Sequence, residues 1–216
     1  MDDRTVSTEA LREYINSAIP ASRGLLREME LDAERDYAPI ADKATAAFLS
    51  VLCAALRPRR ILEIGTAIGY SAVLMRTYAA QGAHISTIER YERAADRAQA
   101  HFEKTGFRDD LSLLRGEAVD ILPTLTGPYD MIFLDGAKGQ YPRFLPDLYR
   151  LLEKGGVLVC DNVLFRGMTA VPELTVRRKK TIVKRLRIFV DDLMAHDGLL
   201  SCILALGDGV TFSVKL

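Results

Sequence analysis

The stretch ILEIGTAIGYS, residues 61–71, decides how the rest of this 216-residue chain is interpreted. Its apolar start is typical of a buried strand, Gly65 and Gly69 follow, and a helix is predicted from about Ser71. Glycine at position 65 lets a ligand approach the backbone closely, and open α/β sheets bind ligands beyond the carboxyl ends of their strands. The stretch therefore predicts a ligand-binding loop, although a tight strand-to-helix turn without a ligand would use the same glycines.

On either side of this stretch, the hydrophobic pattern predicts an α/β fold. From Pro58 onward, short apolar strands alternate with helical segments, which indicates a mainly parallel sheet with helices on both faces. Near the C-terminus, two apolar runs flank Gly207, Asp208 and Gly209, which predicts a hairpin and one antiparallel strand. Residues 7–56 show helical spacing with breaks at two prolines, so three helices are expected there. We expect one domain over residues 1–216, with N-terminal helices in 1–57 and the α/β core in 58–216.

Composition argues against several classes of protein. The chain carries 29 basic and 29 acidic residues, so its net charge favours neither a nucleic-acid coat nor a membrane surface. No apolar run is long enough to span a bilayer, and no export signal follows Met1. The three cysteines lie in apolar runs and are expected to be buried, reduced thiols: Cys53, Cys160 and Cys202. These features predict a cytoplasmic protein without a membrane partner.

An acidic residue ends the strand after the glycine loop. Glu89 lies 24 residues after Gly65, where a carboxylate can accept hydrogen bonds from both hydroxyls of a ribose. A dinucleotide enzyme would show the three-glycine pattern G-x-G-x-x-G, which cradles a pyrophosphate, whereas this loop has only two glycines. A nucleoside without phosphates therefore suits the loop better than a nicotinamide or flavin dinucleotide.

Oxygen donors end two further strands. Asp135 follows MIFL, and Asp161 and Asn162 follow VLVC, so the three side chains are expected at the same edge of the sheet. Carboxylate and amide oxygens suit Mg²⁺, Mn²⁺ or Ca²⁺ rather than zinc. The ordinary alternative is that each aspartate caps a helix or binds loop amides. Lys138 is close enough to act on a metal-bound hydroxyl, or is simply a solvated lysine. The histidines are scattered and expected in loops or at the surface: His84, His101 and His196.

Several blocks together resemble the metal-dependent O-methyltransferases of the catechol and caffeoyl-CoA type. They are EIGTAIGYS, the IE ending at Glu89, GEA at 116–118, FLDGAKGQY and CDN, and the resemblance extends from about Pro39 to the C-terminus. It implies a Rossmann-like class I methyltransferase fold, with a mainly parallel seven-stranded sheet that has one antiparallel strand. The implied cofactor is S-adenosylmethionine, bound by Pro39, Ile40, Glu63, Gly65, Ser71, Glu89, Glu117, Ala118 and Asp135.

The resemblance also implies the chemistry. Asp135, Asp161 and Asn162 would bind a divalent cation, with Mg²⁺ the first choice, and Asp135 and Lys138 would be catalytic, Lys138 as the base. Such a cation lowers the pKa of the bound hydroxyl, while the pocket aligns that oxygen with the sulfonium methyl group. A homodimer is expected from the same resemblance.

The acceptor is predicted by a narrower likeness. DNVLFRGMT, a basic helix and the final GDG resemble the bacterial tRNA 5-hydroxyuridine methyltransferases, which act at the wobble base. Between Val176 and Ile188 lie seven basic residues and no acidic one, which could follow phosphates or simply form a solvated helix face or a dimer contact. The alternatives are an enzyme for catechol-like vicinal diols and a noncatalytic adenosyl- or RNA-binding protein. The predicted RNA contacts are Arg166, Arg177, Lys180, Lys184 and Arg187.

Overall fold

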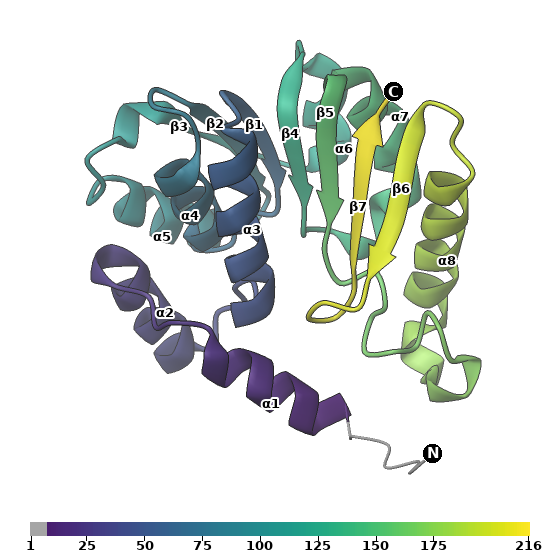
Figure 1. The fold of residues 1–216 in the computed structure, drawn as a ribbon. Helices are drawn as coiled ribbons and strands as arrows, with labels where there is room; N and C mark the ends of the chain where they lie inside the picture. Colours follow the sequence, from purple (N-terminus) through teal and green to yellow (C-terminus); the bar gives the residue numbers. More distant parts are fainter. Residues whose placement is uncertain (1–7) are drawn as a thin grey trace.

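The structure, a computed structural model, describes residues 8–216. Its centre is a seven-stranded sheet in the order β3-β2-β1-β4-β5-β7-β6. β7 is antiparallel to both of its neighbours, and the other strands are parallel. Figure 1 shows the opposite directions of β6 and β7. The predicted fold is confirmed. The strands are Arg60–Ile64 (β1), His84–Glu89 (β2), Leu111–Arg115 (β3), Tyr129–Leu134 (β4), Leu152–Cys160 (β5), Leu199–Leu204 (β6) and Val210–Lys215 (β7).

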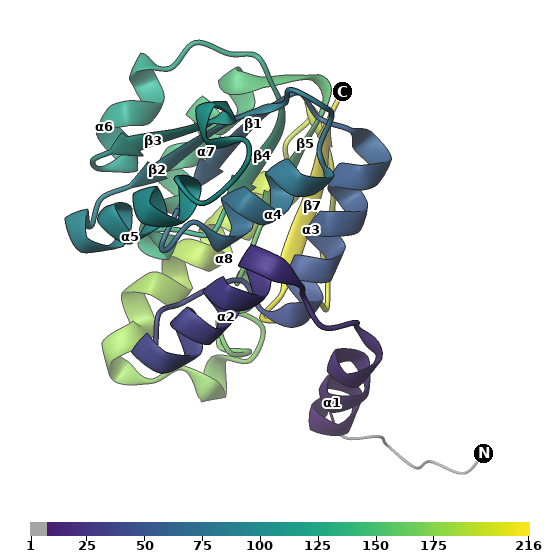
Figure 2. The same ribbon diagram turned by 90° about the vertical axis from the view of Figure 1, so that its left-hand side faces the viewer.

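Helices cover both faces of the sheet (Figures 1 and 2). Three of them precede the first strand, as predicted; the expected start at Ser7 and the residues around Met1 lie outside the described part of the chain. The main helices are Thr8–Ala18 (α1), Gly24–Asp36 (α2), Lys43–Leu56 (α3), Tyr70–Tyr78 (α4), Glu92–Phe102 (α5), Ala118–Ile121 (α6), Tyr141–Leu151 (α7) and Lys180–Met194 (α8).

Two apolar cores follow from the alternation of side chains along the strands. Ile61 and Phe133 belong to the core beneath α2–α5, whereas Leu62 and Leu134 belong to the core beneath α7 and α8. Because both faces of the central strands are buried, those strands read as nearly continuous apolar runs. This is why the sequence pattern predicted them well.

The order in which the chain adds strands to the sheet reverses between β1 and β4. From this pair the chain extends one way through β2 and β3 and the other way through β5, so the helices that follow β1 and β4 lie on opposite faces of the sheet and leave a crevice at the carboxyl ends of the two strands. The two loops meet at glycines: a Cβ atom at position 65 would lie 2.7 Å from the backbone nitrogen of Gly136. Gly65 is therefore required by close packing of backbone against backbone.

Two predictions about burial were wrong. Cys202 is exposed, because β6 is the edge strand of the sheet, whereas Cys53 and Cys160 are buried as expected. His101 is buried rather than at the surface, and its Nδ1 lies 2.8 Å from the carbonyl oxygen of Ile68. Among residues 8–216, no helix is long and apolar enough to cross a membrane.

Candidate active site

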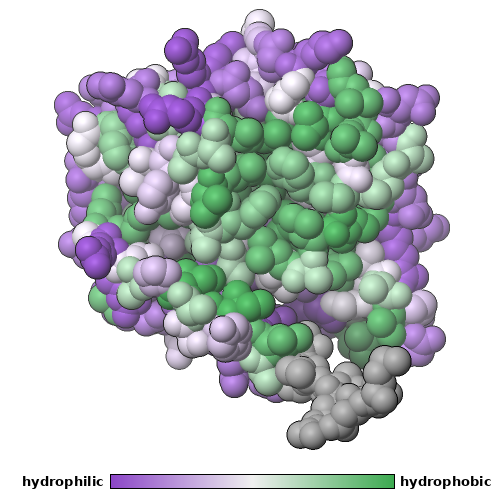
Figure 3. Space-filling view, viewed as in Figure 1, coloured by the Kyte–Doolittle hydropathy of each residue, from purple (hydrophilic) through white to green (hydrophobic). Residues whose placement is uncertain are grey.

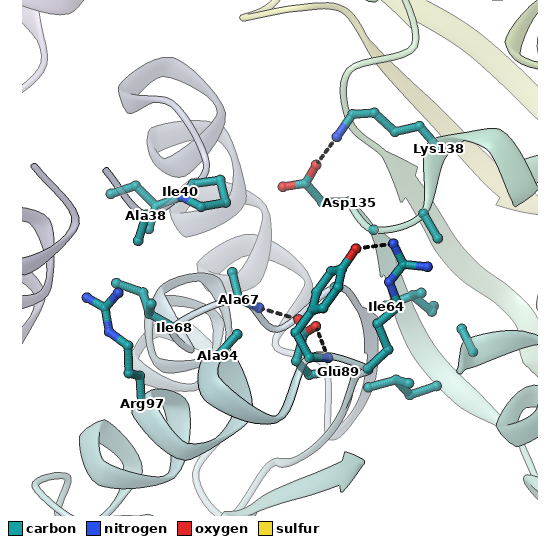
Figure 4. Close-up of a pocket in the computed structure, with 18 of the residues that line it drawn as sticks. Ala38, Ile40, Ile64, Ala67, Ile68, Glu89, Ala94, Arg97, Asp135 and Lys138 are labelled. Carbon is teal, nitrogen blue, oxygen red and sulfur yellow. Dashed lines mark hydrogen bonds and ion pairs between the residues drawn. The ribbon is translucent and has the colours of Figure 1, made fainter. Parts of the chain in front are cut away.

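A pocket of about 870 Å³ lies at the carboxyl ends of the parallel strands. Loops after β1, β2, β3, β4 and β5 line it, together with the segment before α3. Figure 4 shows Asp135 and Lys138 together on one side of this pocket, Ile40 across from them and Glu89 at its base. Ten of the predicted site residues are brought together in its lining: Pro39, Ile40, Gly65, Glu89, Glu117, Ala118, Asp135, Lys138, Asp161 and Asn162.

The glycine loop after β1 is fixed by the neighbouring strand. The backbone N–H groups of Gly65 and Thr66 donate to the carbonyl of Ile88, at 3.0 and 3.2 Å. Gly69 then adopts φ 87° as the residue that precedes α4. The loop is therefore a tight strand-to-helix connection, and Gly65, Ala67 and Ile68 line the pocket.

Glu89 is held in place by backbone amides at the end of β2. Its Oε2 accepts from the N–H of Ala67 and its Oε1 from the N–H of Tyr91, both at 2.9 Å (Figure 4). Each carboxylate oxygen retains a further lone pair. The side chain can therefore accept additional hydrogen bonds from a ligand's two hydroxyls without moving.

Glu63 and Ser71 do not line the pocket, contrary to the prediction. Glu63 is fully buried beneath the glycine loop, where the Thr87 hydroxyl donates to its Oε2 at 2.5 Å and Ser71 also hydrogen-bonds to it. Its Oε1 has no hydrogen-bond partner in the described structure. Burial raises the pKa of Glu63 from its usual 4.5 to about 7. Both side chains support the loop from below rather than touching the pocket.

Asp135, Lys138 and Asp161 form a compact charged group. The Nζ atom of Lys138 lies 3.1 Å from Oδ1 of Asp135, and Oδ1 of Asp161 accepts from the N–H of Asn162 at 2.6 Å. Burial raises the pKa of Asp135, although Lys138 opposes the shift. Burial, and then the charge of Asp135, raises the pKa of Asp161. Two carboxylates share a desolvated site, and within residues 8–216 the ammonium group that compensates them is that of Lys138.

These donors fit a hard divalent cation. A divalent cation would compensate the excess negative charge of the two carboxylates. Two carboxylates with one amide oxygen are also typical ligands of Mg²⁺. In the described part of the chain, no group of three or more His, Cys, Asp or Glu side chains has metal-ligand geometry. The predicted metal ligands do not meet that criterion, because they include only two carboxylates, Asp135 and Asp161, and the third ligand is the amide of Asn162.

The sequence prediction missed Asp42 and several residues at the nucleoside end of the pocket. Asp42 is the N-cap of α3, lines the pocket, and adds to the negative charge felt by Asp135 and Asp161. The Tyr91 ring is 60% exposed in the lining, with the Arg90 guanidinium 4.4 Å from its centre. The position of Asp42 three residues before Thr45, at the start of an apolar helix, is a capping signal that predicts the N-cap of α3 but not its place in the pocket.

The predicted RNA contacts divide into two groups. Arg166, Arg177, Lys180 and Lys184 are exposed. Arg187 instead donates from Nε and an Nη atom to the carbonyls of Thr169 and Met168, at 2.8 and 3.0 Å, so its role is to hold that loop. The basic helix lies beside the pocket wall, because Arg185 donates to the carbonyl of Gly139 at 3.1 Å, next to Lys138.

Comparison with known proteins shows the family to which this chain belongs. The sequence profile of the O-methyltransferase family matches residues 23–216. The catechol O-methyltransferase of Mycobacterium tuberculosis is 35% identical over 56% of this chain and 55% of its own length. The caffeoyl-CoA O-methyltransferase of Populus kitakamiensis is 26% identical over 98% of this chain and 95% of its own.

A solved structure agrees with both relatives. The O-methyltransferase TomG from Streptomyces achromogenes, in complex with SAM, has a TM-score of 0.83 at 25% identity, over 98% of this chain and 99% of TomG. The match covers the N-terminal helices as well as the sheet. The chain therefore belongs to the S-adenosylmethionine-dependent O-methyltransferases of the catechol and caffeoyl-CoA type.

Proposed function

We propose that this enzyme transfers the methyl group to a hydroxyl oxygen that is held by a divalent cation, with Mg²⁺ as the natural ion. The observation that carries the proposal is that Asp135, Asp161 and Asn162 line the same pocket as the glycine loop and Glu89. Such a cation supplies a Lewis acid that lowers the pKa of the acceptor hydroxyl. Two buried carboxylates with raised pKa values favour binding of a cation, because a cation would stabilise their charged forms.

The protein's own groups would then orient the reactants. Glu89 accepts from the ribose hydroxyls of the cofactor, and Gly65 leaves room for it against the backbone. Lys138 takes the proton of the acceptor hydroxyl at its Nζ atom, and the hydroxyl oxygen attacks the sulfonium methyl group, releasing S-adenosylhomocysteine. The Nζ atom of Lys138 lies 3.1 Å from Oδ1 of Asp135, so the amine is held beside the proposed cation ligand.

For the acceptor, we propose 5-hydroxyuridine at the wobble position of tRNA, which would become 5-methoxyuridine in the cytoplasm. The support is a stripe of exposed basic side chains: Lys180 and Lys184 on α8, which contacts the Lys138 segment, and Arg177 in the 3-10 turn just before α8. Tyr141 and Phe144 cannot stack on a base, because both are buried in the core, but Phe165 is only half-buried. The second candidate is a catechol-like vicinal diol, which the relatives favour.

The test combines one variant with two acceptors. Purified enzyme is assayed with S-adenosylmethionine and either hydroxyuridine-containing tRNA or catechol, with and without excess chelator. Chelation or Asp161→Ala should lower turnover by more than about 100-fold, because loss of a group that merely hydrogen-bonds to a metal ligand already costs about 10–100-fold. Cofactor affinity should stay within about twofold. The matched control, Asp197→Ala, removes an exposed aspartate and should change neither value.

Each outcome decides one part of the proposal. Full turnover in excess chelator would contradict the cation. Methylation of catechol but not of tRNA would contradict the tRNA acceptor and leave the catechol-like one. In cells without the gene, tRNA nucleosides should contain hydroxyuridine in place of methoxyuridine by mass spectrometry.

We also propose that the enzyme is a homodimer. Figure 3 shows a broad apolar area on the face where α3 and the C-terminal strands lie. Val51 on α3 is 69% exposed and Leu200 on β6 is 66% exposed. Soluble monomers rarely leave large apolar areas open, and a second copy of the chain presents a matching surface by symmetry.

A further inference from the structure

The loop that follows β5 has an unusual backbone. It begins with Asn162 and includes three residues other than glycine in the left-handed region: Asn162 at φ 58°, Phe165 at 46° and Arg166 at 57°. This region is unfavourable for side chains larger than Asn, and such residues persist only where the surrounding structure fixes them. Something outside the loop must therefore hold it.

The turn of the C-terminal hairpin supplies the contacts. The N–H of Val163 donates to the carbonyl of Gly209, and the N–H of Leu164 donates to the carbonyl of Asp208, both at 3.0 Å. The N–H of Arg166 donates to Oδ1 of Asp208 at 2.5 Å. Asp208 thus accepts two of these three hydrogen bonds, one at its carbonyl oxygen and one at its side chain. The side-chain bond is made to Arg166, a residue in the left-handed region.

The same turn also contacts the opposite wall of the pocket. Gly207 lies against the carboxylate of Asp42, so that a Cβ atom at position 207 would overlap it. Asp42 caps α3 by accepting from the N–H of Thr45 at 2.8 Å, and it lines the pocket together with Ile40, two residues before it. The turn therefore links the segment before α3 to the loop that carries Asn162, although Asp208 does not itself line the pocket.

We infer that Asp208 is a positioning residue: it holds the loop from Asn162 to Met168 in its left-handed conformation and so fixes the amide oxygen of Asn162 for the cation. The inference rests on the proposed function for the cation, and on the hydrogen bonds above for the loop. Groups that orient metal ligands without touching the metal commonly set the affinity of the site. An ordinary surface turn would have no such effect on binding.

The experiment compares Asp208→Ala, which removes the side-chain acceptor of the Arg166 N–H and keeps the backbone carbonyl, with Asp208→Asn, which keeps an oxygen at Oδ1. Binding of Mn²⁺ is measured by electron paramagnetic resonance, S-adenosylmethionine binding by calorimetry, and exchange of the 163–168 amides by hydrogen–deuterium exchange. We expect Asp208→Ala to weaken Mn²⁺ binding about tenfold or more and to speed amide exchange in the loop. Asp208→Asn should restore most of both, and cofactor affinity should stay within about twofold in each variant. Asp197→Ala is the matched control.

The outcomes separate this inference from the proposed function. If wild-type protein binds Mn²⁺ and Asp208→Ala binds it equally well, the inference is overturned and the cation site stands. If wild-type protein binds no Mn²⁺, the cation proposal fails, and with it the part of the inference that concerns Asn162. The exchange data then decide whether Asp208 holds the loop: unchanged protection in Asp208→Ala would overturn that part too. A loss of cofactor binding and of thermal stability in both variants would show general unfolding and contradict a local role.

Discussion

At the residue scale, the carboxyl group of Glu63 is fully buried under the glycine loop, so its ionisation is unfavourable. The Thr87 hydroxyl bonds one of its oxygens, but the other has no partner in the described structure. Burial dominates and raises its pKa to about 7, and the charges of Asp135 and Glu89 act in the same direction. The neutral form of Glu63 is therefore favoured up to a higher pH than usual, and ionisation places a buried charge next to the glycine loop.

This shift predicts how stability depends on pH. An acid whose folded pKa lies above its unfolded pKa binds more protons in the folded state, so its contribution is complete below pH 4.5 and declines as the pH rises to about 7. Glu63→Gln cannot ionise and should remove this decline, on the order of 3 kcal/mol across the window. Thermal unfolding of both proteins between pH 5 and 8 measures it. A constant difference in Tm at every pH, or an equal effect from the exposed Glu153→Gln, would contradict the shift.

At the element scale, helices were predictable because their burial follows the 3.6-residue period, and the central strands because burial of both faces makes them nearly continuous apolar runs. The acidic strand ends were predictable too, since parallel strands bring their carboxyl ends to one edge. Sequence spacing could not reveal what covers each face. Arg187 lies on the polar side of α8, yet the loop at Met168 folds over it, and Cys202 looks apolar but lies on an edge strand. Asp42 was missed because its place in the pocket depends on how α3 meets the sheet.

The basic side of α8 yields a prediction of its own. Reversing the charges of Lys180 and Lys184 should raise the KM for tRNA about tenfold and reduce the salt dependence of tRNA binding by about two phosphate contacts. The kcat with a small diol should not change, because both side chains are exposed and neither lines the pocket. Steady-state kinetics at several salt concentrations measure this. The matched control reverses two exposed lysines elsewhere, Lys104 and Lys154. Equal effects from both double variants would indicate net charge alone and contradict a specific tRNA surface.

At the scale of the whole molecule, helices leave one part of the sheet uncovered. α8 packs on one side of β6, where Ser201 bonds the carbonyl of Leu193, and Leu200 is exposed on the strand's other side. On β7, Phe212 is only half-buried and meets Phe48 of α3 edge to face, with ring centres 6.2 Å apart. An apolar face therefore continues from α3 across the strands (Figure 3).

If a second copy covers this face, a charge in its middle should separate the copies. Wild-type protein should elute with twice the chain mass of 24.0 kDa in size-exclusion chromatography with light scattering. Val51→Glu combined with Leu200→Glu should weaken dimerisation by several kcal/mol, because each change leaves a buried unpaired charge at an apolar contact. Leu31→Glu changes an exposed leucine on α2 and should leave the dimer intact.

This dimer interface is contradicted if wild-type protein is monomeric at micromolar concentration, or if the double variant remains a dimer. The pocket belongs to a single chain in the structure, so the separated double variant should still bind S-adenosylmethionine.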